Sequence, residues 1–324
     1  MRIAVTGGAG FIGSHFVDLA LDCGHDVIVL DALQYAGNLD NLEYALQSDC
    51  FGFLKGDCCD RSSAEIVCKN ADMVIHFAAQ THVDRSIQSP EDFVANNVVG
   101  TEVMLEEALK AKVKRFVYIG TDEVYGSLPD GKFAKETDAF DASSVYSASK
   151  VGAEALVRAY HVTYGLDTII TRGCNTYGPR QYPEKVIPYF CTKAIANENL
   201  PLYADGQNVR EWLWVGDHCK AIIWLLVHGI AGEAYNIGSG VFKKNIEIAK
   251  LILKNVPDTT SKIEFVKDRL GHDKRYALDA NKINSLGWFA DANFKRRFKE
   301  TVVSYIVKGG DKEEIDGKEG TEKV

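Results

Sequence analysis

A glycine-rich segment near the N-terminus constrains the fold more than any other feature of this sequence. The run RIAV predicts a short apolar strand, and TGGAGFIGSHFVDLALDCGHDVIVLD then predicts a turn, an amphipathic helix and a second strand. Gly7, Gly10 and Gly13 have the spacing G-x-x-G-x-x-G. In a dinucleotide-binding βαβ unit the first glycine permits a tight turn, the second lets the backbone approach a pyrophosphate, and the third lets helix and strand pack closely.

Asp31 ends the second strand of this unit, DVIVLD. An acid at that position holds the hydroxyls of the adenosine ribose and repels the 2′-phosphate of NADP. The alternative is an ordinary polar residue at a strand end. The sequence therefore favours NAD over NADP as the cofactor.

Strand and helix patterns alternate through the N-terminal half. Helical segments separate four further apolar runs that predict strands, FGFLKGDCCD, ADMVIHFAA, RFVYIG and DTIITRGCN. This alternation predicts an α/β fold with a Rossmann-type, doubly wound parallel sheet, in which ligands bind beyond the carboxyl ends of the strands. Asp57, Cys58, Ala78 and Ala79 lie at two of these expected ends, so we expect them near the cofactor.

Two adjacent acids follow the fifth expected strand. In RFVYIGTDEVYG, Gly120 marks the end of the apolar run, and Asp122 and Glu123 come directly after Thr121. An acidic pair is most often a solvated loop. Here the strand end places the pair at the ligand-binding edge of the sheet, which favours a functional role.

A tyrosine and a lysine lie four residues apart in SSVYSASKVGAEALVRAYHVTYG, a segment that predicts one long helix. Tyr146 and Lys150 therefore share a face of that helix. A lysine beside a phenol, helped by the positive charge of nicotinamide, favours the phenolate against its usual pKa of about 10. Tyr146 is then a base that can take a hydroxyl proton while hydride leaves the same carbon.

The composition argues against several classes of protein. The 324 residues are 46% hydrophobic and 25% charged, with a formal net charge of −8, and no basic run predicts binding to nucleic acid. The eight cysteines include no C-x-x-C pair, and neighbouring Cys58 and Cys59 are poorly placed to bridge each other, so we expect free thiols and no metal. The sequence shows no signal-peptide pattern and no run of roughly 20 apolar residues that would span a bilayer. We therefore expect a cytoplasmic protein without membrane association.

The pattern becomes mixed after residue 176. PEKVIPYFCTKAIANE predicts a helix, LPLYADG a strand and turn, and HCKAIIWLLVHGI a helix that packs back on the core. We therefore expect an NAD-binding Rossmann domain over residues 1–176, with a later segment at about 212–238 packed onto it. Residues 177–308 are expected to form mainly a smaller substrate-binding lobe. The charged tail KGGDKEEIDGKEGTEKV lacks an apolar face, which predicts disorder over 309–324.

Several segments together resemble one known family. TGGAGFIGSHF with YSASK is similar to the extended short-chain dehydrogenase/reductases, which act on nucleotide sugars. Within them, the chain resembles the nucleoside-diphosphate-glucose 4,6-dehydratases, with the dTDP-glucose enzymes nearest, and this resemblance extends from residue 1 to about residue 290. Six segments carry it: YAGNLDNL, FAAQTHVDRSI, GTDEVYG, YGPRQYPEKVIP, VREWLWVGDH and GHDKRYALD. The triplet Thr121-Asp122-Glu123 discriminates best, because related epimerases and decarboxylases commonly carry another residue, such as serine, in place of Asp122.

The resemblance implies an internal redox dehydration of a nucleoside-diphosphate hexose, with NAD regenerated at each turnover. Tyr146 deprotonates the C4 hydroxyl as hydride passes to NAD⁺, and Thr121 hydrogen-bonds the sugar near C4. Glu123 removes the proton at C5, and Asp122 protonates the departing C6 hydroxyl. Hydride then returns to C6, which yields a 4-keto-6-deoxy sugar nucleotide. The implied substrate is dTDP-glucose or a close relative.

The resemblance also implies which residues contact each ligand. The expected catalytic residues are Thr121, Asp122, Glu123, Tyr146 and Lys150. The expected cofactor contacts are Gly7, Gly10, Phe11, Ile12, Gly13, Asp31, Tyr35, Gly37, Asn38, Asp57, Cys58, Ala78, Ala79, Tyr146 and Lys150. The expected substrate contacts are Ser86 and Thr121, with Asn175, Lys185 and Arg210 at the diphosphate and Asn245, Arg269 and His272 on the nucleoside side. An arginine fork suits phosphate oxygens geometrically. As in relatives, the Tyr146 helix is expected to pair two subunits into a C2 homodimer.

Three departures from the family pattern bear on the substrate. Thr176 stands in NTYGP where a second asparagine is usual, Leu270 replaces a proline in DRLGHD, and the loop GSGVFKKN differs from the usual one but retains Asn245. Two alternatives stay open. One is an NAD-dependent nucleotide-sugar 4-epimerase or decarboxylase, and the other is a non-catalytic NAD-binding regulator. Because a regulator needs no acid–base set, the five expected catalytic residues argue against the second.

Overall fold

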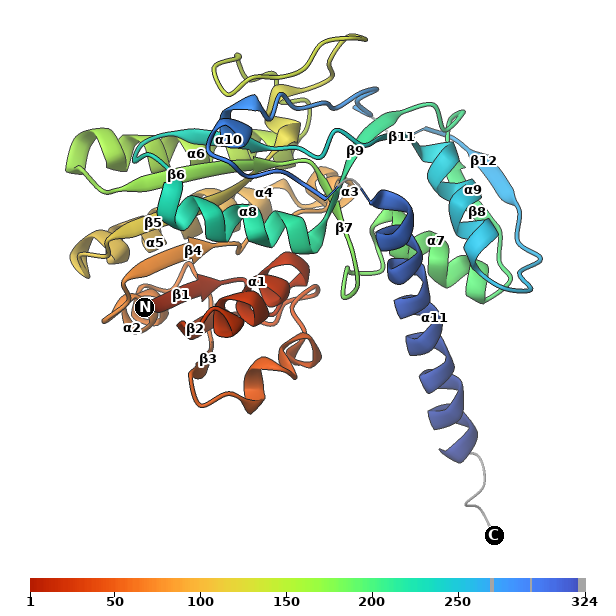
Figure 1. The fold of residues 1–324 in the computed structure, drawn as a ribbon, viewed down its shortest axis with the longest axis horizontal. Helices are drawn as coiled ribbons and strands as arrows, with labels where there is room; N and C mark the ends of the chain where they lie inside the picture. The colour runs from red at the N-terminus through yellow and green to blue at the C-terminus, as the bar shows by residue number, and fades with distance from the viewer. Residues whose placement is uncertain (269–270, 292, 320–324) are drawn as a thin grey trace.

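Seven parallel strands form the main sheet of the computed structural model, which describes residues 1–268, 271–291 and 293–319 (Figure 1). Their spatial order is β10-β6-β5-β4-β1-β2-β3, and every neighbouring pair is parallel. The strands are β1 (Arg2–Thr6), β2 (Asp26–Asp31), β3 (Phe51–Lys55), β4 (Met73–His76), β5 (Arg115–Thr121), β6 (Thr168–Gly173) and β10 (Ala234–Ile237). The predicted Rossmann-type sheet is confirmed. The sequence patterns did not identify β10, which pairs with β6 at the edge.

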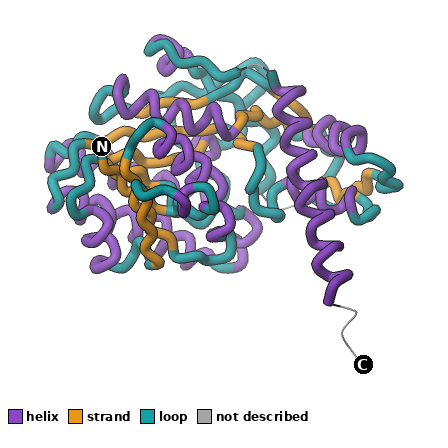
Figure 2. Tube along the Cα trace, turned by 60° about the horizontal axis from the view of Figure 1, so that its bottom comes forward, coloured by secondary structure: helices purple, strands orange, loops and turns teal. Residues whose placement is uncertain are grey.

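Helices cover both faces of this sheet because the buried strand residues alternate between two cores. Ile3 and Val5 belong to the core beneath α1 (Phe11–Asp22), α8 (Val215–His228) and α10 (Asn281–Ser285). Ala4 belongs to the opposite core, which packs against α2 (Arg61–Cys68), α5 (Gly100–Lys110) and α6 (Val145–Tyr164). Figure 2 shows these helices surrounding the strands. A sheet that is apolar on both faces is typical of parallel α/β folds.

A smaller lobe lies to one side of the main sheet in Figure 1. Its two sheets are β11 (Phe242–Lys244), β9 (Val209–Trp214) and β7 (Asn175–Tyr177), and β12 (Ile263–Val266) with β8 (Leu200–Tyr203). Residues of α7 (Val186–Ile195), α9 (Asn245–Asn255) and α11 (Phe294–Glu319) share a third apolar core. The chain is not divided cleanly, since Leu278, Ile283 and Trp288 return to the core of the main sheet.

Short helical turns connect several of the larger elements. They are η1 (Leu39–Leu42), η2 (Ala45–Gln47), α3 (Val83–Gln88), α4 (Pro90–Val94), the π-helical η3 (Ala95–Val99) and η4 (Asp122–Tyr125). Within the described part of the chain, no helix is long and apolar enough to cross a membrane.

Disorder was expected over 309–324, and the structure describes residues 309–319 of this segment as helix. The structure continues α11 through Glu319, and Figure 1 shows this helix projecting away from the lobe. Phe298 and Val302 anchor its first turns in the lobe core. Residues 320–324 lie outside the described residues.

Candidate active site

A cavity of about 310 Å³ lies along the carboxyl edge of the main sheet. The chain reaches it at the ends of β1, β2, β4, β5 and β6, which is the edge where ligands bind in open parallel sheets. The lining includes most of the residues singled out from the sequence: Gly7, Gly10, Phe11, Ile12, Gly13, Asp31, Tyr35, Gly37, Asp57, Cys58, Ala78, Ala79, Thr121, Asp122, Glu123, Tyr146, Lys150, Asn175 and Lys185.

The three glycines of the first turn leave no room for side chains where the turn is tight. Gly7 has a φ of +68°, and a Cβ added there would lie 2.7 Å from the amide nitrogen of Ala78. A Cβ at Gly13 would lie 2.2 Å from the carbonyl oxygen of Gly7. Gly10 caps the N-terminus of α1 without a side-chain hydrogen bond. The first turn of the helix therefore faces the cavity in the way that suits a pyrophosphate.

Asp31 is held at the cavity by the backbone around it. Its Oδ2 accepts a hydrogen bond of 2.9 Å from the amide of Ala9, and its Oδ1 accepts one of 2.8 Å from the amide of Leu33. Burial raises the pKa of this carboxyl, while the two amide donors lower it. A carboxylate has about four acceptor positions, so lone pairs remain for the ribose hydroxyls of a dinucleotide. With the glycine turn, these residues fit NAD.

Asp122 is a buried carboxyl with a free oxygen. Thr121 donates a hydrogen bond of 3.3 Å from Oγ1 to Asp122 Oδ1, while Asp122 Oδ2 has no hydrogen-bond partner among the described residues. Burial raises the pKa of Asp122 well above its ordinary value, and the charges of Glu123 and Glu211 raise it further. The carboxyl is therefore suited to hold a proton at neutral pH and to act as an acid.

Glu123 lies beside Asp122 but in a different environment. Its amide donates a hydrogen bond of 3.2 Å to Thr121 Oγ1, which caps the short helix η4. Glu123 is half-buried, whereas Asp122 is 4% exposed. Its charge also raises the pKa of Tyr146 and Tyr276, so it lies near both phenols. Adjacent carboxyls in unlike environments can divide acid and base roles.

Tyr146 lies next to the acid pair and forms a hydrogen bond with Thr121. Burial raises the pKa of this phenol, and so do the charges of Glu123 and Asp122. Lys150 is not among the groups that shift the pKa of this phenol. Lys150 Nζ instead donates to the carbonyl of Ile119 at 2.7 Å, and burial lowers its pKa to about 7.

A buried ion pair supports the strands behind these residues. Arg172 donates from Nε and Nη2 to Glu154 Oε2 at 2.9 and 2.8 Å, and from Nη1 to Tyr125 Oη at 2.6 Å. Tyr125 in turn donates to Asn236 on β10. Both side chains of the ion pair are at most 5% exposed. No motif in the sequence marked this network, because its members come from four separate segments.

Three of the expected substrate residues, Thr121, Asn175 and Lys185, line the cavity. Asn175 lies at the start of β7, and its Oδ1 is buried without a hydrogen-bond partner among the described residues. Lys185 Nζ donates to the carbonyl of Thr81 at 2.8 Å. Two other expected contacts do not line the cavity. Ser86 is fully buried and donates to the carbonyl of Val83, and Asn38 caps η1 by accepting from the amide of Asp40.

Three more expected substrate residues lie in the smaller lobe, outside the cavity. Arg210 Nη2 donates to the carbonyl of Asp273 at 2.8 Å, and the amide of Asn245 donates to the carbonyl of Asn208 at 3.1 Å. Asn208 bridges the two by donating from Nδ2 to the same Asp273 carbonyl. His272 pairs with Asp268 at 2.6 Å. Arg269 lies outside the described residues.

The lobe is nevertheless coupled to the acid pair. The positive charge of Arg210 lowers the pKa of Asp122, and the charge of Glu123 raises that of Tyr276, whose ring lies under Arg210 at 4.4 Å. The acid pair and these lobe residues therefore lie close enough to contact one extended ligand.

Sequence reasoning missed several polar residues of the cavity. Gln34, Gln80, Thr81, Gln181, Tyr182, Glu184 and His218 all line it. Gln34 follows β2 and Gln80 follows β4, so the strand-end argument that found Asp57 and Ala78 could have found them. His218 Nδ1 forms a hydrogen bond of 2.8 Å with Thr176 Oγ1. Thr176, one of the three departures from the family pattern, thus has a specific hydrogen-bond partner in His218.

The fold and the cavity together define a Rossmann-type enzyme with an acid–base set beside a dinucleotide site. The chain belongs to the NAD-dependent epimerase/dehydratase family, because the sequence model of that family matches residues 3–238. The cofactor of the family is the one that Asp31 predicted, so NAD is confirmed.

Similar proteins are known over nearly the whole length. The low-salt glycan biosynthesis protein Agl12 of Haloferax volcanii is 49% identical, with 94% of this chain and 99% of that protein covered. A dTDP-glucose 4,6-dehydratase of Actinoplanes sp. is 46% identical, with 94% and 98% covered. The crystal structure of DesIV, a dTDP-glucose 4,6-dehydratase from Streptomyces venezuelae with NAD bound, has a TM-score of 0.91 and 44% identity over 96% of this chain and 98% of that one.

Proposed function

We propose that this protein is an NAD-dependent nucleotide-sugar 4,6-dehydratase, a hydro-lyase, with dTDP-glucose as its substrate. The observation that carries the proposal is the triplet Thr121, Asp122 and Glu123, which lies in the cavity beside Tyr146 and Lys150. A buried acid next to a half-buried one is the pair that removal of water from adjacent carbons requires. The relatives named as dTDP-glucose 4,6-dehydratases support the choice of nucleotide sugar.

Each residue has one role in the proposed reaction. Tyr146 takes the proton of the C4 hydroxyl, and Thr121, its hydrogen-bond partner, orients that hydroxyl. When bound, NAD⁺ supplies the redox chemistry, because it takes up the hydride from C4 and gives it back at C6. The positive charge of the oxidised cofactor, together with that of Lys150 when it is protonated, would lower the pKa of the phenol, which burial and the charges of Glu123 and Asp122 raise.

Water leaves through the acid pair. Glu123 removes the proton at C5, and Asp122 gives its proton to the C6 hydroxyl, which departs as water. Glu123 then returns a proton to C5 as C6 receives the hydride. The proton gained by Tyr146 balances the one lost by Asp122, and both groups are restored by exchange with solvent.

The substrate extends from the cavity toward the lobe. Asn175 and Lys185 hold the diphosphate at the cavity, and Arg210 holds it from the lobe, where Asn245 and His272 contact the nucleoside. Arg269, which lies outside the described residues, is proposed as a further nucleoside contact from the resemblance alone. The position of Arg210 supports its part in this assignment, because it lies close enough to Asp122 to lower the pKa of that carboxyl.

A product assay tests the proposal. Purified protein incubated with dTDP-glucose is expected to yield the 4-keto-6-deoxy sugar nucleotide, seen by mass spectrometry as loss of one water. UDP-glucose and UDP-N-acetylglucosamine, tested in parallel, report the preference for the nucleoside. An epimer of unchanged mass would establish a 4-epimerase instead, loss of carbon dioxide from a uronic acid substrate would establish a decarboxylase, and no turnover with any of them would favour the regulator.

We infer that the protein works as a C2 homodimer in the cytoplasm. Ala148, Ala155, Ala159 and Val162 form an exposed stripe of small and apolar residues along α6, which supports pairing of this helix with its copy. All eight cysteines are free thiols, as proteins of a reducing compartment have. Sedimentation of a monomer at micromolar concentration would contradict the dimer.

A further inference from the structure

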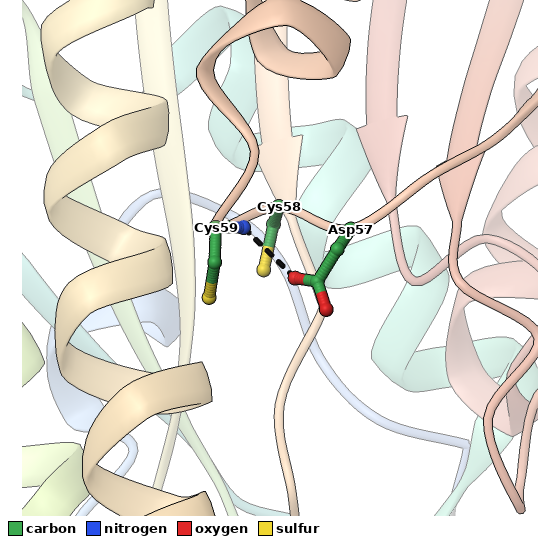
Figure 3. A group of neighbouring side chains, drawn as sticks. All are labelled: Asp57, Cys58 and Cys59. Atoms are coloured by element: carbon green, nitrogen blue, oxygen red, sulfur yellow. Dashed lines mark hydrogen bonds between the residues drawn. The ribbon is translucent and has the colours of Figure 1, made fainter.

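Three potential metal ligands follow β3 at the end of the cavity that contains Asp31. Asp57, Cys58 and Cys59 each offer one ligand atom, and these atoms all lie within 4.8 Å of one another. Figure 3 shows the three side chains on the same side of their loop. The amide of Cys59 donates to Asp57 Oδ1 at 2.8 Å, a turn that brings adjacent side chains to one side instead of alternating them as a strand would.

The surrounding structure leaves space for both sulfurs. A Cβ added to Gly100, the first residue of α5, would lie 2.6 Å from Cys58 Sγ and 3.3 Å from Cys59 Sγ. Glycine inside a helix costs about 1 kcal/mol relative to alanine, so its presence here is explained by the room that the two sulfurs need. Cys59 Sγ also donates to the carbonyl of Ala95 at 3.4 Å, in the π-helical turn before α5.

We propose that Asp57, Cys58 and Cys59 bind a thiophilic divalent cation of the Zn²⁺ class. Two thiolates and one carboxylate are ligands that Zn²⁺ accepts, and a tetrahedral site with three protein ligands keeps one position for water. With Zn–S bonds of about 2.3 Å, two bound sulfurs lie about 3.8 Å apart. Atoms already within 4.8 Å need to move by only about an ångström to reach that geometry.

Binding of this cation excludes NAD. Asp57 and Cys58 line the cavity in which we place the cofactor, and the carbonyl of Asp31 accepts the amide of Gly56 at 3.1 Å, which ties this loop to the ribose position. A cation held by these side chains occupies that end of the cavity. A cation bound at this site therefore inhibits the enzyme, because it competes with NAD for the cavity. This competition rests on the proposed cofactor position, whereas it does not depend on the sugar chemistry.

Equilibrium titration with Zn²⁺ alone tests the site. The full-length protein, stripped of NAD and kept reduced with a phosphine, is titrated against a chromophoric chelator, with and without saturating NAD⁺. We expect one ion per chain, with an apparent Kd that rises with NAD⁺ concentration. Cys58→Ser and Cys59→Ser are each expected to weaken binding by at least about tenfold, since loss of an outer partner of a metal ligand alone costs 10- to 100-fold.

Two exposed cysteines provide matched controls. Cys23→Ser and Cys50→Ser remove thiols outside the cluster and are expected to leave Zn²⁺ binding and dehydratase activity unchanged. Gly100→Ala is a third test, because the methyl group of the new alanine would displace the sulfurs of Cys58 and Cys59 while all three ligands remain. Far-UV circular dichroism of each variant checks its folding. The proposal is overturned if no ion binds, if folded Cys58→Ser and Cys59→Ser both retain wild-type affinity, or if saturating NAD⁺ leaves the affinity unchanged.

Discussion

The edge of the main sheet and the smaller lobe hold their polar residues in different ways. At the sheet edge, Asp31 is bound by the amide two residues further on, and Thr121 caps the turn that carries the acid pair. In the lobe, Arg210 is held by the carbonyl of Asp273, which lies 63 residues away in the chain. The first kind of site is built from neighbours in sequence, and the second from long-range contacts.

Both regions contain deeply buried polar groups, but only the sheet edge carries the proposed acid–base set. Asp122, Tyr146 and Lys150 are each at most 7% exposed, and burial is the largest cause of the pKa shift in all three. In the lobe, Arg210 and Tyr276 are 6% and 3% exposed. Because the acid–base set lies at the sheet edge, we expect substitutions there to change the chemistry, and substitutions in the lobe to change substrate binding.

The largest effect is expected for Glu123→Gln. Loss of a positioned base typically lowers the rate by about 100- to 10,000-fold, and here it removes the group that takes the C5 proton. The readout is turnover in deuterated water of substrate carrying deuterium at C4. Wild type is expected to move the C4 label to C6 within one molecule and to take solvent deuterium at C5. The variant is expected to oxidise C4 but to show almost no exchange at C5.

Asp122→Asn tests the other acid of the pair. Asparagine cannot supply the proton that the C6 hydroxyl needs, so elimination is expected to slow by about 100-fold or more. Exchange at C5 is expected to fall less, because Glu123 remains. The same labelled assay measures both steps. If both variants keep full dehydration, or if the C4 label washes out into solvent, the pair is only a solvated loop and the proposed mechanism is wrong.

Sequence reasoning succeeded where the signal is local. Gly7, Asp31 and the acid pair each sit at the end of an apolar strand, and the sheet brings those ends to one edge. It was less successful where a side chain has a competing partner nearby. Ser86 was expected at the substrate, but its hydroxyl donates to a carbonyl three residues earlier. A sequence pattern does not predict a hydrogen bond of that kind.

Long-range partners set a second limit. Nothing in the sequence indicated that Arg172 pairs with Glu154 or that β10 joins the sheet, because both depend on how distant segments meet. The environment of Tyr146 shows the same limit. Its spacing to Lys150 predicted a shared helix face, but did not indicate the burial and the two acids that raise the pKa of the phenol.

Arg172→Met is expected to cause the next largest effect, on stability. It leaves Glu154 buried without its partner, and removal of one member of a buried ion pair costs about 3–5 kcal/mol. Urea denaturation measures the change. Lys114→Met is the matched control, since its ion pair with Asp72 is on the surface and such pairs contribute about 0–1 kcal/mol. Equal losses in the two variants would contradict the distinction between buried and exposed pairs.

Arg210→Lys probes the lobe. Lysine keeps the positive charge near Asp122 but loses the planar fork that fits a phosphate. We expect KM for the nucleotide sugar to rise by about tenfold, which is about 1.4 kcal/mol, with little change in kcat. Arg275→Lys, which changes a half-buried arginine of the same region that donates to the carbonyl of Pro129, serves as the control. A large fall in kcat with unchanged KM would place Arg210 in the chemistry instead of in substrate binding.

The smallest expected effect is a dependence of stability on pH that originates from Lys150. Burial lowers its pKa from 10.5 to about 7, so between these values the unfolded chain holds a proton that the folded chain has released. Stability of the ligand-free protein therefore rises with pH across this window, by at most about 1.4 kcal/mol per pH unit from this group. Urea denaturation at pH 7.5 and 8.5 measures the gain, and Lys150→Met is expected to reduce it.

A lysine of the lobe supplies the contrast for this measurement. Lys193 is only half-buried, and its hydrogen bond to Glu198 raises its pKa above 10.5, so it stays protonated in both states between pH 7.5 and 8.5. Lys193→Met is therefore expected to leave the pH dependence as it is in wild type. If Lys150→Met also retains the wild-type dependence, Lys150 is charged in the folded protein near neutral pH. Its ammonium group would then already act on Tyr146 before NAD binds.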